Sequence, residues 1–197
     1  MHYICLLFSA GDHVKFGQPM AATITQIAWG GLSFQSGYEA AGQLDYLKAC
    51  LKWGTDYFIE AHISTNVFIG QVGDGLIDHL YWGRPEDMTM ERPSFYLTED
   101  APGSDLVGET AAALAASSIV YRNLNDTALA DQALSHAREL FEFANNFRGV
   151  YTDSIPEAAD FYRCTNIYKH NDNIISNDVS LLAHLVMWMS FHGLQHG

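Results

Sequence analysis

One amphipathic pattern in the first third of the chain most constrains the fold. Leu44, Leu47 and Leu51 recur at intervals of three and four residues, and Phe58 continues the same apolar stripe. Residues at this spacing share one face of an α-helix, so the pattern predicts a single long helix within residues 38–62. A helix with one apolar face must bury that face against another element.

Further helices are predicted along the chain. A helix is expected after Pro19, and the alanine-rich run from Ser104 to Arg122 predicts another whose small side chains allow close packing. Asp126 or Thr127 is a typical cap for a third, ending near residues 145–146. No alternation typical of strands is evident, and residues 63–103 are rich in glycine, proline and charge, which predicts a loop region. The predicted fold class is therefore all-α, with paired helices and functional loops at one end.

Composition limits the classes of partner. The chain has 197 residues, of which 48% are hydrophobic, enough for the core of one domain. A net charge of −13 disfavours nucleic acid and anionic membranes as partners, because both would repel the surface. The three cysteines show no C-x-x-C spacing, so we expect no metal and no cofactor. No apolar run reaches the length of a membrane helix.

The stretch S-A-G-D-H-V-K-F-G supplies the first catalytic candidate. Asp12 stands between an apolar opening and the first predicted helix, where a loop carboxylate could act as a general base that takes a proton from water. From spacing alone, an ordinary surface acid near a helix start explains Asp12 better. Its neighbour His13 adds little, because adjacent side chains usually diverge.

Aromatic residues supply candidate sugar-binding positions. His79, Tyr81 and Trp82 lie together in the glycine-rich loop, and an aromatic ring beside polar groups suits a pyranose, which has one apolar face and a rim of hydroxyls. A loop held by its own hydrogen bonds is the alternative. Phe161 and Tyr162 form a second pair, for which sugar stacking and core packing are equally good explanations.

Taken together, these segments resemble glycoside hydrolase family 9, the endoglucanases or cellulases. The resemblance rests on A-G-D-H-V-K-F-G-Q-P-M, Q-V-G-D-G-x-x-D-H-x-x-W-G-R-P-E-D-M, R-P-S-F-Y, P-G-S-D-L-V-G-E-T and Y-T-D-S-I-P-E-A-A-D-F-Y, which occur in this order over about residues 10–163. It implies an (α/α)6 barrel of helical hairpins that hydrolyses β-1,4-glucan with inversion at the anomeric carbon.

The resemblance also implies roles for individual residues. The family's opening motif reads D-A-G-D; its second Asp, the base, corresponds to Asp12, and its first Asp, which assists, corresponds to Ser9. His79, Tyr81 and Trp82 match the family's substrate-cleft loop, although Tyr81 stands where the family usually has a tryptophan. Phe161 and Tyr162 match aromatic residues near the sugar subsites.

The resemblance weakens after Tyr162, where the family usually continues into S-G-Y-N-D-E-L. We therefore expect residues 1–163 to be the N-terminal part of a family 9 catalytic domain, giving a truncated barrel, and residues 164–197 to be a divergent tail. The family's catalytic acid, a Glu near the end of a much longer domain, is expected to be missing, so the chain alone should be weakly active or inactive.

Three functions remain open at this stage. The first is an endoglucanase part, and the second is a carbohydrate-binding or scaffold protein without hydrolysis, which Ser9 slightly favours. The third is a helical interaction module without a sugar role, which leaves the loop motifs unexplained. The resemblance implies a secreted protein, although the opening M-H-Y-I-C-L-L-F-S-A has no Lys or Arg before its apolar run and is not a convincing signal peptide.

Overall fold

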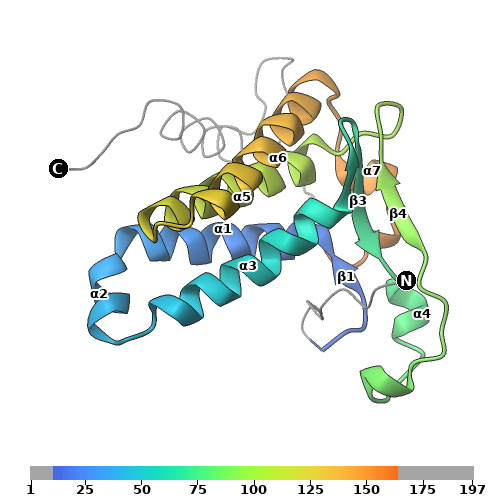
Figure 1. The fold of residues 1–197 in the computed structure, drawn as a ribbon. Helices are drawn as coiled ribbons and strands as arrows, with labels where there is room; N and C mark the ends of the chain where they lie inside the picture. Colours follow the sequence, from blue (N-terminus) through green and yellow to red (C-terminus); the bar gives the residue numbers. More distant parts are fainter. Residues whose placement is uncertain (1–10, 164–197) are drawn as a thin grey trace.

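The computed structural model describes residues 11–163, so Ser9 and the tail after residue 163 lie outside the described residues. Helices dominate this part of the chain (Figure 1). They are α1 (Gly17–Ser33), α2 (Gln35–Ala40), α3 (Leu44–Ala61), the one-turn helix α4 (Gly75–Asp78), α5 (Ser104–Asn123), α6 (Thr127–Asn146) and the one-turn helix α7 (Tyr151–Ser154), with short 3-10 turns at Pro85–Asp87 and Pro156–Ala158.

Helix α5 is the centre of the helical layer. It is buried along almost its whole length, including every residue from 105 to 118, and it packs against α1 on one side and α6 on the other. The alanines at 111–113, 115 and 116 have no side chain beyond Cβ, so neighbouring helices approach closely. The prediction of an alanine-rich packing helix that begins at Ser104 is confirmed, and so is Asp126 as the cap of α6, where its carboxylate accepts a hydrogen bond from the Leu129 amide.

The long amphipathic helix predicted within residues 38–62 is confirmed as α3, which carries Leu44, Leu47, Leu51 and Phe58, but this helix does not extend back over residues 38–43. The chain instead leaves α2 at Ala41 and enters α3 at Leu44. Gly42 has φ +65°, the Gly42 amide donates to Glu39, and the Gln43 amide donates to the Tyr38 carbonyl. This is the Schellman arrangement that ends helices at a left-handed glycine. The apolar stripe from Leu44 to Phe58 lies wholly within α3, and Gly42 precedes it, so this glycine sets where the helix begins and leaves the stripe unbroken.

The predicted loop region also contains strands that the sequence analysis missed. A small antiparallel sheet forms from β1 (Lys15–Phe16), β2 (His62–Ser64), β3 (Val67–Val72) and β4 (Ser94–Leu97). Strand β4 pairs with one edge of β3, while β1 and β2 share the other edge. These strands are two to six residues long, too short to show the alternation that identifies a strand in a sequence.

The sheet is joined to α6 through two histidines. His62, at the end of α3, is buried, and its Nδ1 lies 2.9 Å from Nδ1 of His136 on α6. Burial first and the neighbouring His136 second lower the pKa of His62 below its ordinary 6.5, while Glu139 and the backbone of Thr65 and Ser64 act in the opposite direction. The folded protein therefore prefers His62 neutral.

Stability is expected to fall in mildly acidic solution because of His62. Between its lowered folded pKa and its unfolded value near 6.5, the unfolded chain binds more protons, so each step down in pH favours unfolding. Urea unfolding at pH 7.5 and pH 5.5 should show the loss, and the loss should be smaller in His62→Gln. An identical pH dependence in parent and variant would contradict this assignment.

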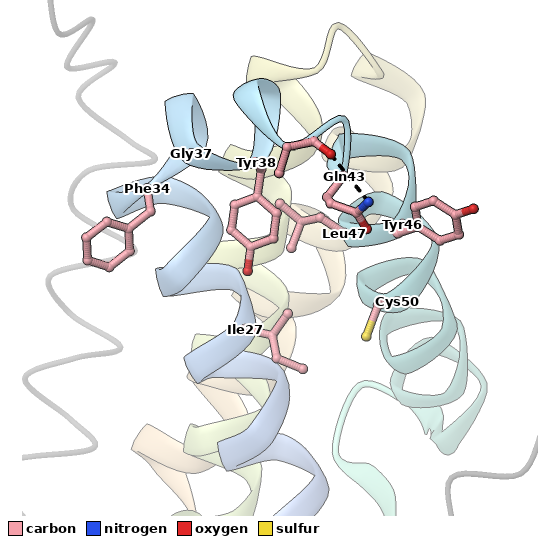
Figure 2. A pocket seen from close by; sticks show the side chains of 9 residues that line it. Ile27, Phe34, Gly37, Tyr38, Gln43, Tyr46, Leu47 and Cys50 are labelled. Carbon is pink, nitrogen blue, oxygen red and sulfur yellow. Dashed lines mark hydrogen bonds between the residues drawn. The ribbon is translucent and has the colours of Figure 1, made fainter.

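The far end of α1 carries a shallow pocket of about 470 Å³ (Figure 2). Its lining is mostly apolar and comes from α1, α2 and α3, including Ile27, Phe34, Tyr38 and Leu47. Asp12 precedes the opposite end of α1, so this pocket is not the predicted sugar site. Within residues 11–163, no helix has both the length and the apolar character needed to cross a membrane.

Candidate active site

The loop that carries Asp12 is fixed by strand pairing immediately after it. Lys15 pairs with Val72 and Phe16 with Gln71, so β1 holds the loop beside the segment that leaves β3. That segment turns at Gly73, whose φ of +91° is a left-handed conformation that favours glycine. The pairing brings residues about 60 positions apart in sequence to one end of the sheet.

The one-turn helix α4 begins immediately after this turn. The Asp74 carboxylate caps it by accepting hydrogen bonds from the amides of Leu76 and Ile77, at 2.8 and 3.2 Å. Such a cap satisfies backbone donors that a helix start otherwise leaves without partners. Asp78 is the last residue of this helix, and the predicted site residue His79 follows it as the C-cap, so α4 positions both side chains.

A buried carboxylate ties α4 to the Asp12 loop. Asp78 is 4% exposed, and its Oδ1 accepts one hydrogen bond from the His13 backbone amide and a second from the His13 ring, each at 3.0 Å. Arg92 lies within electrostatic reach of Asp78, and burial lowers the pKa of Arg92 while Tyr57 and Asp78 raise it. Through its two hydrogen bonds, Asp78 anchors His13, the residue next to the candidate base Asp12.

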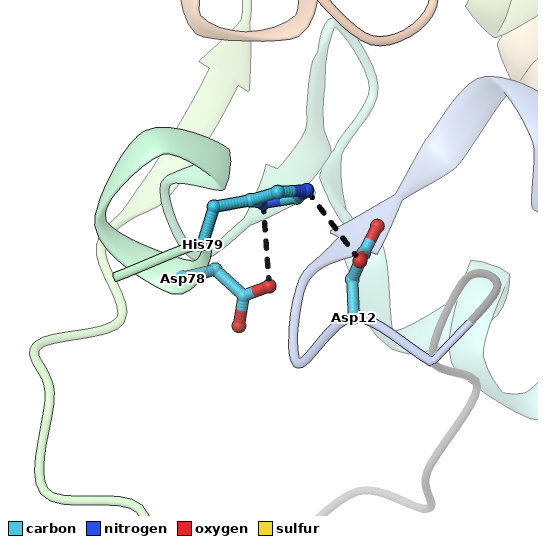
Figure 3. Close-up of side chains that lie close together, drawn as sticks. All are labelled: Asp12, Asp78 and His79. Atoms are coloured by element: carbon cyan, nitrogen blue, oxygen red, sulfur yellow. Dashed lines mark ion pairs between the residues drawn. The ribbon is translucent and has the colours of Figure 1, made fainter. Parts of the chain in front are cut away.

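His79 faces Asp12 across the gap between the two segments (Figure 3). Its Nδ1 lies 2.7 Å from the Gly75 carbonyl, which only accepts, so Nδ1 carries a proton. The other ring nitrogen, Nε2, lies 3.9 Å from Asp12 Oδ1. Half of the His79 side chain and a quarter of the Asp12 side chain are exposed, which leaves both groups open to a substrate.

Two aromatic side chains close one side of this arrangement. The Phe161 ring lies 5.0 Å from the His79 ring and 5.2 Å from the Phe16 ring, and Tyr162 contacts Phe16 edge-on at 5.0 Å. A Cβ on Gly75 would come within 2.3 Å of the Phe161 ring, so only glycine allows α4 to approach this closely. Both aromatic rings pack on the buried Phe16 and remain partly exposed. They therefore contribute to core packing and still present surface on which a sugar could stack.

Tyr81 and Trp82 occupy different positions. The Tyr81 ring contacts His13 edge-on at 5.5 Å, and its hydroxyl donates to the Arg84 carbonyl at 3.2 Å. Trp82 is fully exposed. Single exposed apolar side chains are common on protein surfaces, and what the exposure of Trp82 provides is an apolar face that is available to a ligand.

Three of the predicted residues therefore meet directly: Asp12, His79 and Phe161. Tyr162 and Tyr81 join through Phe16 and His13, Trp82 stands free at the surface, and Ser9 lies outside the described residues. One ligand atom each from Asp12, Asp78 and His79 would fit around a cation, but the same closeness suits a carboxylate base among hydrogen-bonding neighbours. Sequence reasoning missed the His13–Asp78 bond, since only contact across 65 residues reveals it.

Comparison with known proteins decides the family. The family model for glycosyl hydrolase family 9 matches residues 7–185. The chain belongs to glycosyl hydrolase family 9. This match includes residues 164–185, beyond the point at which the sequence analysis expected the resemblance to end.

Relatives of the family 9 chain are consistently longer than it is. Endoglucanase 7 of Oryza sativa subsp. japonica is 49% identical over 162 residues, which cover 82% of this chain and 30% of that relative. The endoglucanase of the termite Nasutitermes takasagoensis has a solved structure with a TM-score of 0.83 and 51% identity, covering 91% of this chain and 39% of that one. Endoglucanase CelQ of Clostridium thermocellum, solved with cellotetraose, gives a TM-score of 0.72 and 30% identity, covering 91% and 27%.

The predicted fold class is confirmed by these neighbours. Solved family 9 endoglucanases have an (α/α)6 barrel, and the mostly helical chain described here forms part of that barrel. The chain spans about a quarter to two fifths of the length of the relatives and structures it matches.

Proposed function

We propose that this chain supplies the general base and one wall of the glucan cleft of an inverting endo-β-1,4-glucanase. The observation that carries the proposal is the position of Asp12, 3.9 Å from His79 Nε2, on a loop anchored by the buried Asp78. An accessible carboxylate on a rigid support, with a polar neighbour and an aromatic wall, is the arrangement that water activation beside a sugar requires.

The chemistry needs a second carboxyl group. In an inverting reaction, Asp12 would take a proton from water as the water oxygen bonds to the anomeric carbon, while a carboxylic acid on the other side gives its proton to the departing glycosidic oxygen. The two groups stand roughly 6.5–9.5 Å apart to leave room for the water. By family resemblance the acid is a Glu near the end of a longer domain, and we place it outside this chain.

Ser9 belongs to the same proposal. It stands where the family has an aspartate that assists the base, and a serine hydroxyl keeps hydrogen-bonding capacity but has no charge. The aromatic groups Trp82, Phe161 and Tyr162 would form the wall against which pyranose rings stack. The substrate class is a cellulose-type glucan, and secretion is expected at the level of the family.

Hydrolysis by the purified 197-residue chain is expected to be at or near background. The reason is that a base without its acid leaves the glycosidic oxygen to depart without a proton. Release of reducing sugar from carboxymethylcellulose measures this, with Asp12→Asn as the matched control. Robust turnover that Asp12→Asn abolishes would mean that the acid is in this chain.

A carbohydrate-binding role without hydrolysis is the second candidate. The full exposure of Trp82 favours it, because an exposed indole can bind a sugar whether or not catalysis follows. The replacement of the assisting aspartate by Ser9 points the same way. Saturable binding of cello-oligosaccharides with no product release, even when the rest of a family 9 barrel is supplied, would favour this candidate over the first.

A further inference from the structure

We propose that His62 and His136 form a binding site for a divalent transition-metal ion, with Glu139 as the outer partner of His62. The site lies away from the Asp12 loop, where the end of α3 and the start of β2 meet α6. The site is independent of the glucanase proposal. The two histidines are 74 residues apart, so no local sequence motif predicts their contact.

The spacing of the two ring nitrogens carries the proposal. Nδ1 of His62 and Nδ1 of His136 are 2.9 Å apart, with the ring planes at 75° and the ring centres 5.1 Å apart. Two ligands about 2.0–2.1 Å from one metal ion, at a right angle, lie about 2.9 Å from each other. The imidazoles are therefore already at the distance of neighbouring ligands in square-planar or octahedral coordination.

A carboxylate lies near the second nitrogen of His62, which is buried and has no hydrogen-bond partner within the described residues, so a change of the Glu139 rotamer would bring the two into contact. Glu139 Oε2 lies 4.0 Å from the other nitrogen of His62, Nε2. Metal-binding histidines usually donate their second ring N–H to a carboxylate, which fixes the tautomer and strengthens the ligand. His136 and Glu139 are one turn apart on α6, so the order along the site is carboxylate, His62, metal, His136.

Access and protonation agree with this arrangement. The His62 side chain is 2% exposed, whereas His136 is half-buried and 47% of the Glu139 side chain is exposed, so an ion enters from the α6 side. Without metal, one Nδ1 donates its proton to the other. When both Nδ1 atoms bind an ion, that proton moves through solvent to Nε2 of its own ring, and two neutral rings release no net proton.

Cu²⁺ is the probe of choice, because imidazole ligands at right angles suit its tetragonal geometry and it binds most tightly among divalent first-row ions. Calorimetric titration of the metal-free 197-residue chain should show one more Cu²⁺ equivalent than His136→Gln. His79→Gln, which removes a histidine from the Asp12 group, should keep the Cu²⁺ equivalent that His136→Gln loses. Electron paramagnetic resonance should show two coordinated nitrogens for this ion in the parent, and this signal should be missing in His136→Gln.

Glu139→Gln keeps the test decisive if His136→Gln fails to fold by circular dichroism. Loss of the outer carboxylate should weaken Cu²⁺ binding about 10–100-fold without changing the number of ions bound. Unchanged stoichiometry and affinity in His136→Gln, or unchanged affinity in Glu139→Gln, would overturn the proposal. Loss of the ion in His79→Gln alone would also overturn it, because the ion would then belong to the Asp12 group.

Discussion

Asp12→Asn is expected to lower kcat by roughly 10²–10⁴-fold once a complete family 9 barrel surrounds the site, which is the contribution typical of a general base. A chimaera in which residues 11–163 of this chain replace the matching part of the termite endoglucanase supplies that barrel, because the two share 51% identity and a TM-score of 0.83. Asparagine keeps the shape of the side chain but is not able to take a proton from water. Initial rates on carboxymethylcellulose measure the effect.

The control for this prediction is Asp100→Asn, which neutralises an exposed loop acid. Its kcat should equal that of the parent chimaera. If Asp12→Asn and Asp100→Asn were equally active, Asp12 would be an ordinary loop acid, the explanation that spacing alone favoured. The comparison therefore separates the role implied by the family from the role implied by position.

Phe16→Ala is expected to reduce the free energy of unfolding by about 3–5 kcal/mol, the usual cost of deleting a buried phenylalanine ring. Phe16 is 2% exposed, and its ring supports both Phe161 and Tyr162. Its loss leaves a cavity at the junction of β1 with the aromatic wall, so the wall should loosen together with the fold. Urea unfolding followed by tryptophan fluorescence gives the value.

Phe34→Ala is the matched control for the stability measurement, because it deletes the same ring from a position that is 69% exposed. A change within about 0.5 kcal/mol is expected there, as for most surface substitutions. Equal losses at the two positions would show that Phe16 does not have the supporting role assigned to it.

The helices were predictable from local patterns, and their interruptions were not. The start of α5 at Ser104 and the cap of α6 at Asp126 follow from the residues themselves. The break between α2 and α3 depends on Gly42 adopting a left-handed conformation, two residues before the apolar stripe begins at Leu44. The periodicity therefore located α3 correctly, whereas the start of the helix depends on the backbone geometry of one glycine.

The sequence was sufficient to predict residues of the candidate site, but not the contacts that hold those residues in place. Asp12 and His79 came from family motifs, and the structure brings them to 3.9 Å. The hydrogen bonds from His13 to Asp78, and the close approach of Gly75 to Phe161, depend on the pairing of β1 with β3, a pair only two residues long. A strand pair of two residues has no detectable periodicity in the sequence. The contacts that stiffen the site are therefore visible only in the structure.

Binding of cellotetraose to the purified 197-residue chain tests the central claim, a glucan cleft on this chain, most directly. Calorimetric titration should show saturable binding in the parent and in Trp53→Ala, whose indole is partly exposed on α3. Trp82→Ala should bind about tenfold or more weakly, as expected when a principal aromatic contact is lost. Absence of saturable binding in the parent, or equal affinity in Trp82→Ala and Trp53→Ala, would contradict the account.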